Sequence, residues 1–314
     1  MNRKYIILFL WLLATLSGQS LRVGFWNVEN LFDLEDDPTT RDEEFALGGK
    51  KNVTQDIYDL KLKNCAAVLA DLNADVLGLC EVENYFVLDE LNRAYDGRDY
   101  KIIHYDSPDR RGIDNALLYD PEVFNVIATK PILNTLPEGG PTRDILYVQG
   151  EYKGHTLHIY VNHWPSNYGG KKKAIPKRRA TARLLVNEVA EKLSNEPDAE
   201  ILLIGDFNEE PTDDNVRTLK SVNMTSMMEP LMGQPQVGTY VYRGKDNFLD
   251  QIIISTGLQD EQGLTAGQVA ILDKPKYRQQ EGKYAHYPFR FWAGNKLLGG
   301  YSDHLAVYVE INAR

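Results

Sequence analysis

The sequence predicts an α+β fold in which a two-layer β core carries its helices on the outside. Three observations support this prediction. Segments with strand-like patterns outnumber helical ones, several strands are linked as hairpins, and others alternate with helices. An all-parallel sheet would need a long crossover between its strands and fits this mixture less well. The sequence also has no internal repeat at a fixed short period, which argues against solenoids and propellers.

The first half of the chain begins with a strand and then alternates helices with strands. LRVGFWN at 21–27 predicts a strand, and the polar, acidic segment 33–55 predicts a long surface loop. Apolar residues recur at helical spacing over 56–72. DVLGLCE at 75–81 is a nearly continuous apolar run, as expected of a strand inside a covered sheet. The next expected elements are a helix at 87–95 and strands at 100–105 and 115–119.

The second half is predicted to contain a hairpin and then a helix that leads into a buried strand. A Lys-Gly turn joins the expected strands 145–152 and 155–162. The clearest helix spans 176–194, with Pro176 in its first turn. It leads into EILLIGD at 200–206, another buried strand. The last expected elements are strands at 250–255 and 305–311.

Residues 1–20 have the pattern of a secretory signal peptide. A basic pair precedes an apolar run at 5–13, and Gly18 and Ser20 stand three residues and one residue before the expected cleavage point. The run is too short to span a bilayer. We therefore expect an exported chain, periplasmic or extracellular after cleavage, with one domain at 21–314 and no stable membrane insertion. The alternative is an uncleaved anchor or a buried first strand.

Charge and cysteine content limit the kinds of partner. The sequence has 35 basic and 45 acidic residues and a formal charge of −10. This balance opposes tight binding of nucleic acid by overall charge, but it leaves room for a local basic groove. Cys65 and Cys80 are its only cysteines, and both lie in apolar stretches, so two buried thiols and one disulfide are both compatible with the pattern. No structural zinc site is expected from so few cysteines.

Polar residues capable of chemistry stand at the ends of the apolar strands. The set consists of Asn27, Glu81, His163, Asp206, Asn208, Asp250, Asp303 and His304. A rigid strand that ends in a loop fixes the geometry of such side chains, which is why ligands and catalytic groups concentrate there. Each residue alone also has a structural explanation, such as a turn cap for an Asx residue or a packed histidine in the core.

As a set, these residue types fit metal-assisted hydrolysis of phosphoesters. Mg²⁺ requires oxygen ligands, which Glu81 with Asn27 and Asp303 would supply. The reaction also needs an in-line water, a group that orients or deprotonates it, and positive charge near the phosphate oxygens. An Asp bonded to one ring nitrogen of a His favours the charged imidazole that can provide this charge. No Walker A loop or Gly-x-Ser-x-Gly motif in the sequence supports a competing chemistry.

At these residues the sequence resembles the endonuclease/exonuclease/phosphatase superfamily, which includes DNase I-like nucleases, abasic-site endonucleases, sphingomyelinases and inositol polyphosphate phosphatases. The matching segments are FWNVENLFD at 25–33, VLGLCEVEN at 76–84, RRGIDNALLYD at 110–120, VNHWPS at 161–166, LIGDFNEEP at 203–211, LDQI at 249–252 and YSDHLAV at 301–307. They follow the family's order and span nearly all of 21–314. The resemblance implies a four-layer α/β/β/α sandwich (DNase I-like) in a secreted, bacterial-type member.

The resemblance also implies a role for each residue. Glu81 is similar to the principal metal-binding glutamate, Asn27 to the asparagine that supports the metal, and Asp303 to the aspartate beside it. The implied cation is Mg²⁺, with Mn²⁺ or Ca²⁺ as alternatives. The implied catalytic positions are His163 at the scissile phosphate, Asp206 and Asn208 at the water and phosphate, and Asp250 with His304 as an Asp–His dyad. Family members differ over whether an aspartate or the histidine is the base, and that choice stays open here.

A basic run follows the expected catalytic histidine. It consists of Lys171, Lys172, Lys173, Lys177, Arg178, Arg179 and Arg183. One interpretation is a phosphate-binding rim, with Arg178 and Arg179 as the candidates that face inward. The other is a solvated loop and helix face. Arg111 is a further candidate phosphate contact, with a structural role in a turn as its alternative.

DNA or RNA is the expected substrate, because an exported phosphodiesterase with a local basic strip fits the scavenging of nucleic acid. A phospholipid headgroup, as in the sphingomyelinases, and an inositol phosphate are the alternatives. The sequence shows no amphipathic helix or apolar hairpin for insertion into a membrane surface. A catalytically inactive binding module is the non-enzymatic alternative, and the complete set of competent residues argues against it. We expect a monomer.

Overall fold

The computed structural model describes residues 20–137 and 139–314, so the predicted signal peptide lies outside the described residues except for Ser20. Two six-stranded sheets form the centre of the molecule. The first contains β1 (Leu21–Leu31), β2 (Val76–Val82), β3 (Lys101–His104), β4 (Asp114–Tyr119), β13 (Leu264–Ile271) and β16 (Val307–Ala313). The second contains β5 (Asn125–Ile132), β6 (Ile145–Tyr152), β7 (His155–His163), β8 (Glu200–Asp206), β9 (Thr225–Ser226) and β12 (Asp250–Ile254).

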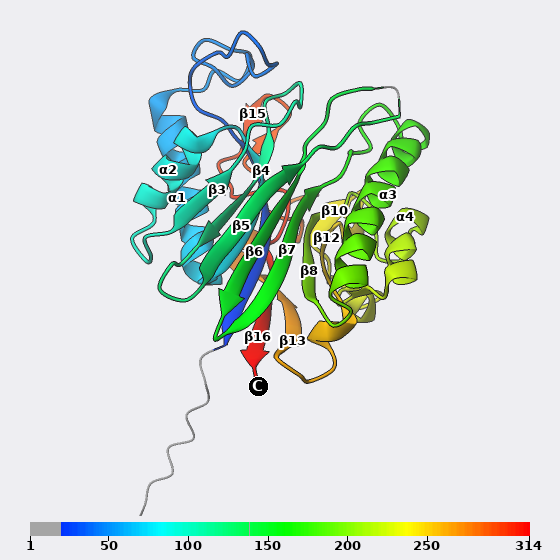
Figure 1. The fold of residues 1–314 in the computed structure, drawn as a ribbon. Coiled ribbons are helices and arrows are strands. Elements are labelled where there is room, and N and C mark those ends of the chain that lie inside the picture. Colours follow the sequence, from blue (N-terminus) through cyan, green and yellow to red (C-terminus); the bar gives the residue numbers. More distant parts are fainter. Residues whose placement is uncertain (1–19, 138) are drawn as a thin grey trace, which may run out of the picture.

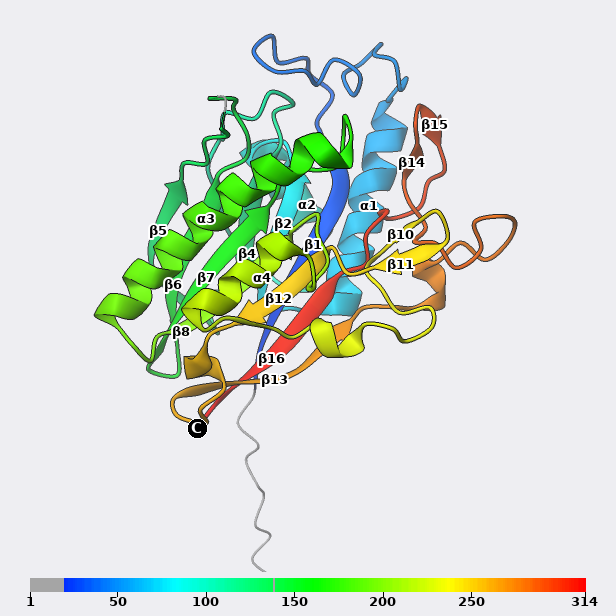
Figure 2. The ribbon, with the colours of Figure 1, turned by 90° about the vertical axis from the view of Figure 1, so that its right-hand side faces the viewer.

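Helices cover the outer face of each sheet. Figure 1 shows α1 (Gln55–Leu72) and α2 (Tyr85–Ala94) on one side, and α3 (Lys171–Asn195) and α4 (Asp214–Arg217) on the other. The view in Figure 2 shows α3 and α4 lying across the second sheet. Short hairpins, β10 (Tyr240–Tyr242) with β11 (Lys245–Asn247) and β14 (Trp292–Ala293) with β15 (Lys296–Leu297), lie outside the two sheets. The predicted α+β sandwich is confirmed.

The strand orders are β13-β16-β1-β2-β4-β3 and β5-β6-β7-β8-β12-β9. In each sheet one pair of central strands is parallel, β1 with β2 and β7 with β8, whereas the other pairs are antiparallel. Parallel neighbours end at the same edge of a sheet, so β1 and β2 bring their last residues together, as do β7 and β8. The polar strand ends therefore gather at one edge of each sheet.

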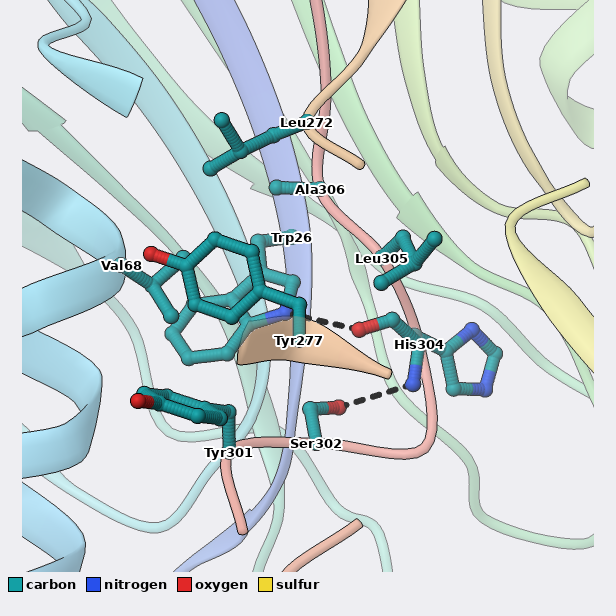
Figure 3. Close-up of a pocket in the computed structure, with 9 residues that line it drawn as sticks. All are labelled: Trp26, Val68, Leu272, Tyr277, Tyr301, Ser302, His304, Leu305 and Ala306. Carbon is teal, nitrogen blue, oxygen red and sulfur yellow. Dashed lines mark hydrogen bonds between the residues drawn. The ribbon is translucent and has the colours of Figure 1, made fainter. Parts of the chain in front are cut away.

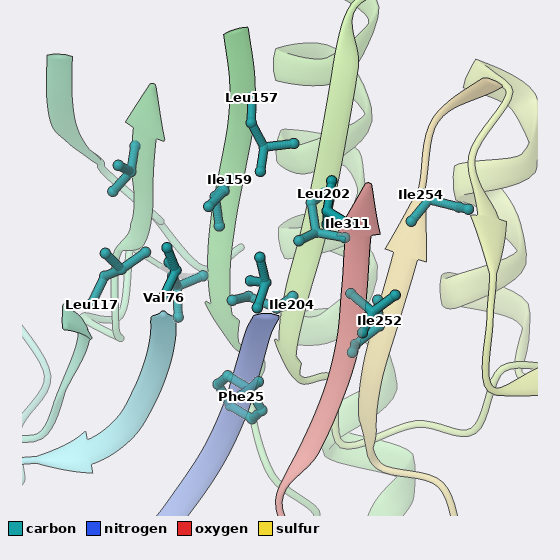
Figure 4. Close-up of a cluster of buried hydrophobic side chains, with 14 of the residues drawn as sticks. Phe25, Val76, Leu117, Leu157, Ile159, Leu202, Ile204, Ile252, Ile254 and Ile311 are labelled. Carbon is teal, nitrogen blue, oxygen red and sulfur yellow. The ribbon is translucent and has the colours of Figure 1, made fainter. Parts of the chain in front are cut away.

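The main core fills the space between the two sheets. Phe25 of the first sheet and Ile204 of the second belong to this cluster and are fully buried (Figure 4). Successive side chains of a strand point to opposite faces, so the neighbouring Trp26 packs with α1 and Leu203 with α3. Because both faces of the central strands are covered, their sequences are continuous apolar runs rather than alternating ones.

Four of the longer elements were not predicted or differ from their predicted bounds by more than two residues, and the short elements α4, β9, β10, β11, β14 and β15 were not predicted. β5 and β13 were not predicted, because each is an edge strand with many exposed or half-buried positions and therefore lacks a clear apolar pattern. β1 continues past Asn27 to Leu31 through a register shift. α3 begins at Lys171, so Pro176 lies inside the helix rather than in its first turn. A proline inside a helix removes one N–H from the ladder, and its ring meets the carbonyl four residues earlier at a cost of about 3 kcal/mol. The packing of α3 on the second sheet must offset this cost.

The two cysteines are buried free thiols. Cys65 lies on α1 in the cluster between this helix and the first sheet, whereas Cys80 lies on β2 in the cluster between the sheets. They point into different layers, which resolves the alternative of a disulfide. Within the described part of the chain, no helix is long and apolar enough to cross a membrane.

Candidate active site

Strand ends from both sheets meet at one edge of the molecule. Asn27 lies in β1, Glu81 in β2, and His163 and Asp206 are the last residues of β7 and β8. The sheet register pairs Asp206 with His163 on one side and with Asp250 on the other. Across the sandwich, Asn27 Nδ2 donates a hydrogen bond to Asp206 Oδ2 (3.2 Å). This bond joins the two sheets at the site.

Asp206 lies at the centre of this group. Its Oδ2 is 3.8 Å from His163 Nε2 and 3.9 Å from His304 Nε2. His163 Nε2 is also 3.8 Å from Glu81 Oε1. These separations are too long for hydrogen bonds. The side chains of Asp206, His163, His304 and Glu81 therefore surround a shared space and are not hydrogen-bonded to one another across it.

His304 is fixed through both its ring and its backbone. The ring atom Nδ1 lies 2.7 Å from Oδ2 of the fully buried Asp250. The backbone N–H donates to Ser302 Oγ (3.0 Å), and the carbonyl accepts from Trp26 Nε1 (3.2 Å). Figure 3 shows the imidazole directed away from the mainly apolar residues that pack behind this backbone. The ring is thus held with Nε2 toward Asp206.

The two histidines have opposite charge preferences. Burial disfavours the charged form of His304, but the carboxylates of Asp250 and Asp206 outweigh it and raise its pKa well above the ordinary value. Burial and the nearby charge of Arg143 lower the pKa of His163 well below it. Burial raises the pKa of Asp206 to about 7, against the opposing charge of His304. At neutral pH the site therefore combines a charged His304 with a neutral His163.

Glu81 points into the site through an unusual backbone conformation. Its φ of 61° lies in the left-handed region, where β2 shifts register against β4. Its Oε2 accepts from Asn30 N–H (3.1 Å), and Oε1 faces His163. The amide oxygen of Asn27, which accepts from Glu29 N–H (3.0 Å), lies at the same edge. Carboxylate and amide oxygens are the donors that a hard divalent cation requires, so these residues fit a metal site.

Asp303 lies at the same edge, but its carboxylate already forms an ion pair with Arg290. Its Oδ2 is 3.0 Å from an amino group of Arg290, which also lies 3.3 Å from Glu29 Oε1. A cation at Asp303 would therefore compete with Arg290. Among the described residues at this edge, the closest convergence of metal-binding atoms is that of Asp206, Asp250 and His304, within 4.8 Å of one another.

Glu29 is a buried carboxylate that sequence reasoning missed. It accepts hydrogen bonds from the backbone N–H groups of Phe291 (2.6 Å) and Trp292 (3.1 Å). Burial, together with the charge of Asp303, raises its pKa to about 7. The signal that could have identified it is its place two residues after Asn27, between the apolar Val28 and the polar Asn30, in a strand that is buried along almost its whole length. It ties the end of β1 to the segment that carries Arg290.

Asn208 and Arg143 both bind the carbonyl of Trp164. Asn208 donates to it from Nδ2 (3.0 Å) and to Asp206 Oδ1 from its backbone N–H (2.8 Å). The buried Arg143 donates to the same carbonyl (2.8 Å) and pairs with Asp109 (3.1 Å). Sequence reasoning missed Arg143, because its partners come from distant loops. Together these bonds fix the chain that leaves His163.

The prediction that Arg178 binds phosphate is wrong. Its side chain is fully buried, and its guanidinium pairs with Glu209 (2.8 Å). It also donates to the Pro165 carbonyl (2.9 Å) and to Asn167 Oδ1 (3.1 Å). Helical spacing turns this one residue of the basic run toward the sheet. There its N–H groups are already hydrogen-bonded to acceptors within the protein. Arg178 therefore fastens the loop after His163 to α3.

The other two candidate phosphate contacts are exposed. Arg179 lies on the solvent side of α3. Arg111 has a side chain that is 44% exposed, with Nε 3.6 Å from Asp109 Oδ1. Its charge is close enough to contribute to the lowered pKa of His163. Of the three predicted arginines, Arg111 is thus the exposed one whose charge acts on a site residue.

The chain is similar to known proteins in both sequence and fold. A profile of the Endonuclease/Exonuclease/phosphatase family matches residues 22–313. Among solved structures, truncated TDP2 of Caenorhabditis elegans is similar with a TM-score of 0.62 and 19% identity, over 95% of this chain and 99% of that one. D. rerio TDP2 complexed with single-strand DNA product gives 0.60 and 16%, over 93% and 99%. The human Nocturnin catalytic domain with bound sulfate gives 0.59 and 17%, over 94% and 95%.

At these identities the structural likeness concerns the fold alone, and no curated protein matches the sequence. The family match spans almost all of the described chain and both sheets. It agrees with the acid–histidine cluster at the common edge of the sheets. The chain therefore belongs to the endonuclease/exonuclease/phosphatase family and is a divalent-metal-dependent hydrolase of phosphoester bonds.

Proposed function

We propose that the chain is a phosphodiesterase that hydrolyses DNA or RNA by direct attack of water on the phosphate. One observation carries this proposal. The imidazole Nε2 atoms of His163 and His304 lie 3.8 and 3.9 Å from Asp206 Oδ2 around one shared space. A hydrogen-bond acceptor beside two imidazoles suits an attacking water on one side and a phosphate oxygen on the other.

The residues around this space have separate tasks in the proposed reaction. Asp206 accepts a hydrogen bond from the water and orients it for in-line attack. Asp250 holds the charged His304, whose Nε2–H donates to a phosphate oxygen as charge develops there. Asn208 supports Asp206 through its backbone N–H. Bound by Glu81 with Asn27 and Asp303, a divalent cation would neutralise charge on the phosphate.

Nucleic acid is the proposed substrate because exposed cations lie beside the site. Arg111 is directly accessible there, and Lys171, Lys172 and Lys173 begin the helix that follows His163. Phosphate contacts of this type dominate the affinity of proteins for nucleic acids. The complex of D. rerio TDP2 with single-strand DNA product indicates that this fold accommodates such a strand in a related structure.

A phospholipid headgroup is the second candidate. Large apolar side chains are exposed just after the end of β2, with Tyr85 at 55% and Phe86 at 52%. Tyr85 and Phe86 follow Glu81 by only a few residues, at the start of α2. Exposed aromatics at this place favour contact with a lipid surface or with bases.

A panel of substrates separates these candidates. Plasmid DNA, RNA, sphingomyelin vesicles and inositol hexakisphosphate are each incubated with residues 21–314, with Mg²⁺ or with EDTA. We expect cleavage of DNA or RNA that EDTA abolishes. Cleavage of sphingomyelin or of the inositol phosphate without any cleavage of nucleic acid would overturn the proposed substrate.

We also propose that the chain is exported. The support is the sequence pattern of residues 1–20, of which 1–19 lie outside the described residues. The test is N-terminal sequencing of the protein recovered from the periplasm or medium of a bacterial host that expresses the full chain. A mature form that begins at Leu21 is expected, whereas a cell-bound form that retains its first residues contradicts export by cleavage.

A further inference from the structure

A groove of about 700 Å³ lies between the start of α3 and two loops. Three cations line it: Arg110 from the loop before β4, and Lys173 and Lys177 from α3. Its apolar wall contains Leu136 and Pro141 from the loop before β6, and Pro176 from α3. In Figure 1 the loop before β6 and the first turn of α3 lie at the same upper end of the molecule.

Within residues 20–137 and 139–314, the groove cations Arg110, Lys173 and Lys177 make no ion pair. By contrast, Arg178 and Lys192 on helix α3 are paired with Glu209 and Glu196. The protein as a whole carries a formal charge of −10. Unpaired cations gathered in one concave place make a local positive potential that attracts an anion.

Both segments that carry the cations of the groove lead along the chain to the active site. Arg110 precedes Arg111, whose charge acts on His163, and neighbouring Cα atoms are about 3.8 Å apart. In the other segment, the loop after His163 leads into α3, and Arg178 holds that loop against the helix. The same two segments therefore border both the groove and the catalytic edge.

We propose that this groove, formed by Arg110, Lys173 and Lys177, binds a single nucleic-acid strand next to the scissile phosphate. The proposal deepens the proposed function and rests on it. Lys173 and Lys177 are four residues apart on one helix face, with Cβ atoms about 5–6 Å apart, so they offer charge at two points along the groove. A strand that crosses the active site and continues past Arg111 would meet these charges with its flanking phosphates.

The apolar wall selects the kind of anion. A small inorganic anion, or a duplex that presents only its phosphates, has no apolar group to pack on Leu136, Pro141 and Pro176. A single strand has exposed base faces and sugars that pack on such surfaces while its phosphates contact cations. Cations on one side and apolar side chains on the other thus match an unpaired strand.

Binding of a labelled oligothymidylate of about twelve nucleotides tests the proposal. Fluorescence anisotropy is measured in the non-cleaving His304→Ala background, at several salt concentrations, with a thymidine dinucleotide as the short probe. Lys173→Ala with Lys177→Ala is compared with Lys63→Ala with Arg217→Ala. The second pair removes the same charge from exposed helix positions that lie outside the basic run and do not line the groove.

We expect the groove pair to weaken binding of the long strand by roughly tenfold or more and to reduce its salt slope by about 1.4, which is two single-strand phosphate contacts. The control pair should change affinity by less than about twofold, and the dinucleotide should not distinguish the variants. Equal losses in the two pairs, or an equal loss for the dinucleotide, would overturn the groove as a flanking subsite.

Cleavage of the same strand by the otherwise unmodified chain with Mg²⁺ is measured in parallel. If binding depends on the groove but the strand is never cleaved, the proposed reaction fails while the groove stands. If the strand is cleaved but the groove pair binds it as tightly as the control pair, the groove fails while the reaction stands.

Discussion

At the scale of single residues, several site residues have a left-handed backbone conformation that is rare for residues other than glycine. Glu29, Glu81 and Asn208 have φ values of 56°, 61° and 50°. Each such residue costs about 1–3 kcal/mol, and it persists only where the surrounding structure holds it. All three lie at or beside the ends of strands that carry site residues. The rigid sheets supply the support that turns these side chains toward the common edge.

Asp250→Asn tests the dyad. We expect kcat to fall by about 10²–10⁴-fold with little change in KM, because a neutral amide no longer favours the charged His304 or fixes its ring. Steady-state cleavage of a labelled oligonucleotide provides the measurement. Asp260→Asn, an exposed aspartate, is the matched control and should retain full activity. A kcat of the Asp250 variant close to that of the control would exclude a catalytic dyad.

At the scale of elements, α3 separates buried from exposed members of one basic run. Arg178→Met leaves Glu209 buried without its cation, so we expect the free energy of unfolding to fall by about 3–5 kcal/mol. Arg179→Met, one residue further on the exposed side, should change it by less than about 0.5 kcal/mol. Urea unfolding of both variants measures the difference. Equal small losses would contradict the structural role assigned to Arg178.

Asp71 joins α1 to the 3₁₀ turn η4 (Pro275–Tyr277), and this link is pH-dependent. Burial alone would raise the pKa of Asp71, but hydrogen bonds from Lys276, Tyr277 and Lys274 lower it to about 2. The folded pKa lies below the unfolded value of about 3.9. The contribution to stability is therefore complete above pH 4 and is lost as the pH falls through about 2.

Asp71→Asn should accordingly lower the free energy of unfolding at pH 7, by up to about 1 kcal/mol because its partners Lys274 and Lys276 are half exposed and solvent screens the ion pairs. The difference from the unsubstituted chain should shrink between pH 4 and pH 2. Urea unfolding at several pH values measures it. A difference that is the same at pH 7 and pH 2 would show that the carboxylate charge is not involved.

The sequence predicts elements well where both faces are buried. β6 and β8 have the predicted bounds, because apolar runs mark covered strands. β5 escaped prediction because an edge strand buries few side chains, and it includes Pro131, which an edge tolerates. The start of α3 escaped because its first turn is lysine-rich and carries no apolar stripe.

The site residues also fall into those that local sequence patterns reveal and those that they do not. Its strand-end residues stand out locally, because polar groups interrupt apolar runs. Arg143 and Arg290 do not, because their roles come from partners far along the chain, such as Trp164 and Glu29. Arg178 was predicted to face the substrate because charge alone does not indicate which side of a helix is covered. Local sequence patterns thus do not predict contacts between side chains that are far apart along the chain.

At the scale of the whole molecule, the two sheets must keep a fixed distance for the site to exist. They approach closely at Gly78, where an added Cβ would lie 2.7 Å from Ile204 Cδ1. The site draws Glu81 and Asn27 from one sheet and His163 and Asp206 from the other. A change in the separation of the sheets would therefore separate the metal-binding residues from the catalytic ones.

Gly78→Ala should lower the free energy of unfolding by about 1–3 kcal/mol through overpacking between the sheets. Ile204→Val removes the atom that the new methyl group would meet, so the cost of Gly78→Ala should be smaller in that background. A double-mutant cycle by urea unfolding measures this coupling, expected at about 0.5–3 kcal/mol. Additive effects of the two substitutions would show that the sheets are not in tight contact at this point.

The central claim is that strand ends from both sheets form one metal-dependent site for phosphodiester hydrolysis. The most direct test is the rate of oligonucleotide cleavage by residues 21–314 and by Glu81→Gln and Asp206→Asn, one substitution in each sheet, with Mg²⁺ or with EDTA. We predict cleavage by the unsubstituted chain with Mg²⁺, none with EDTA, and losses of at least about 10²-fold in both variants. Cleavage that persists in EDTA, or at an unchanged rate in either variant, would contradict the claim.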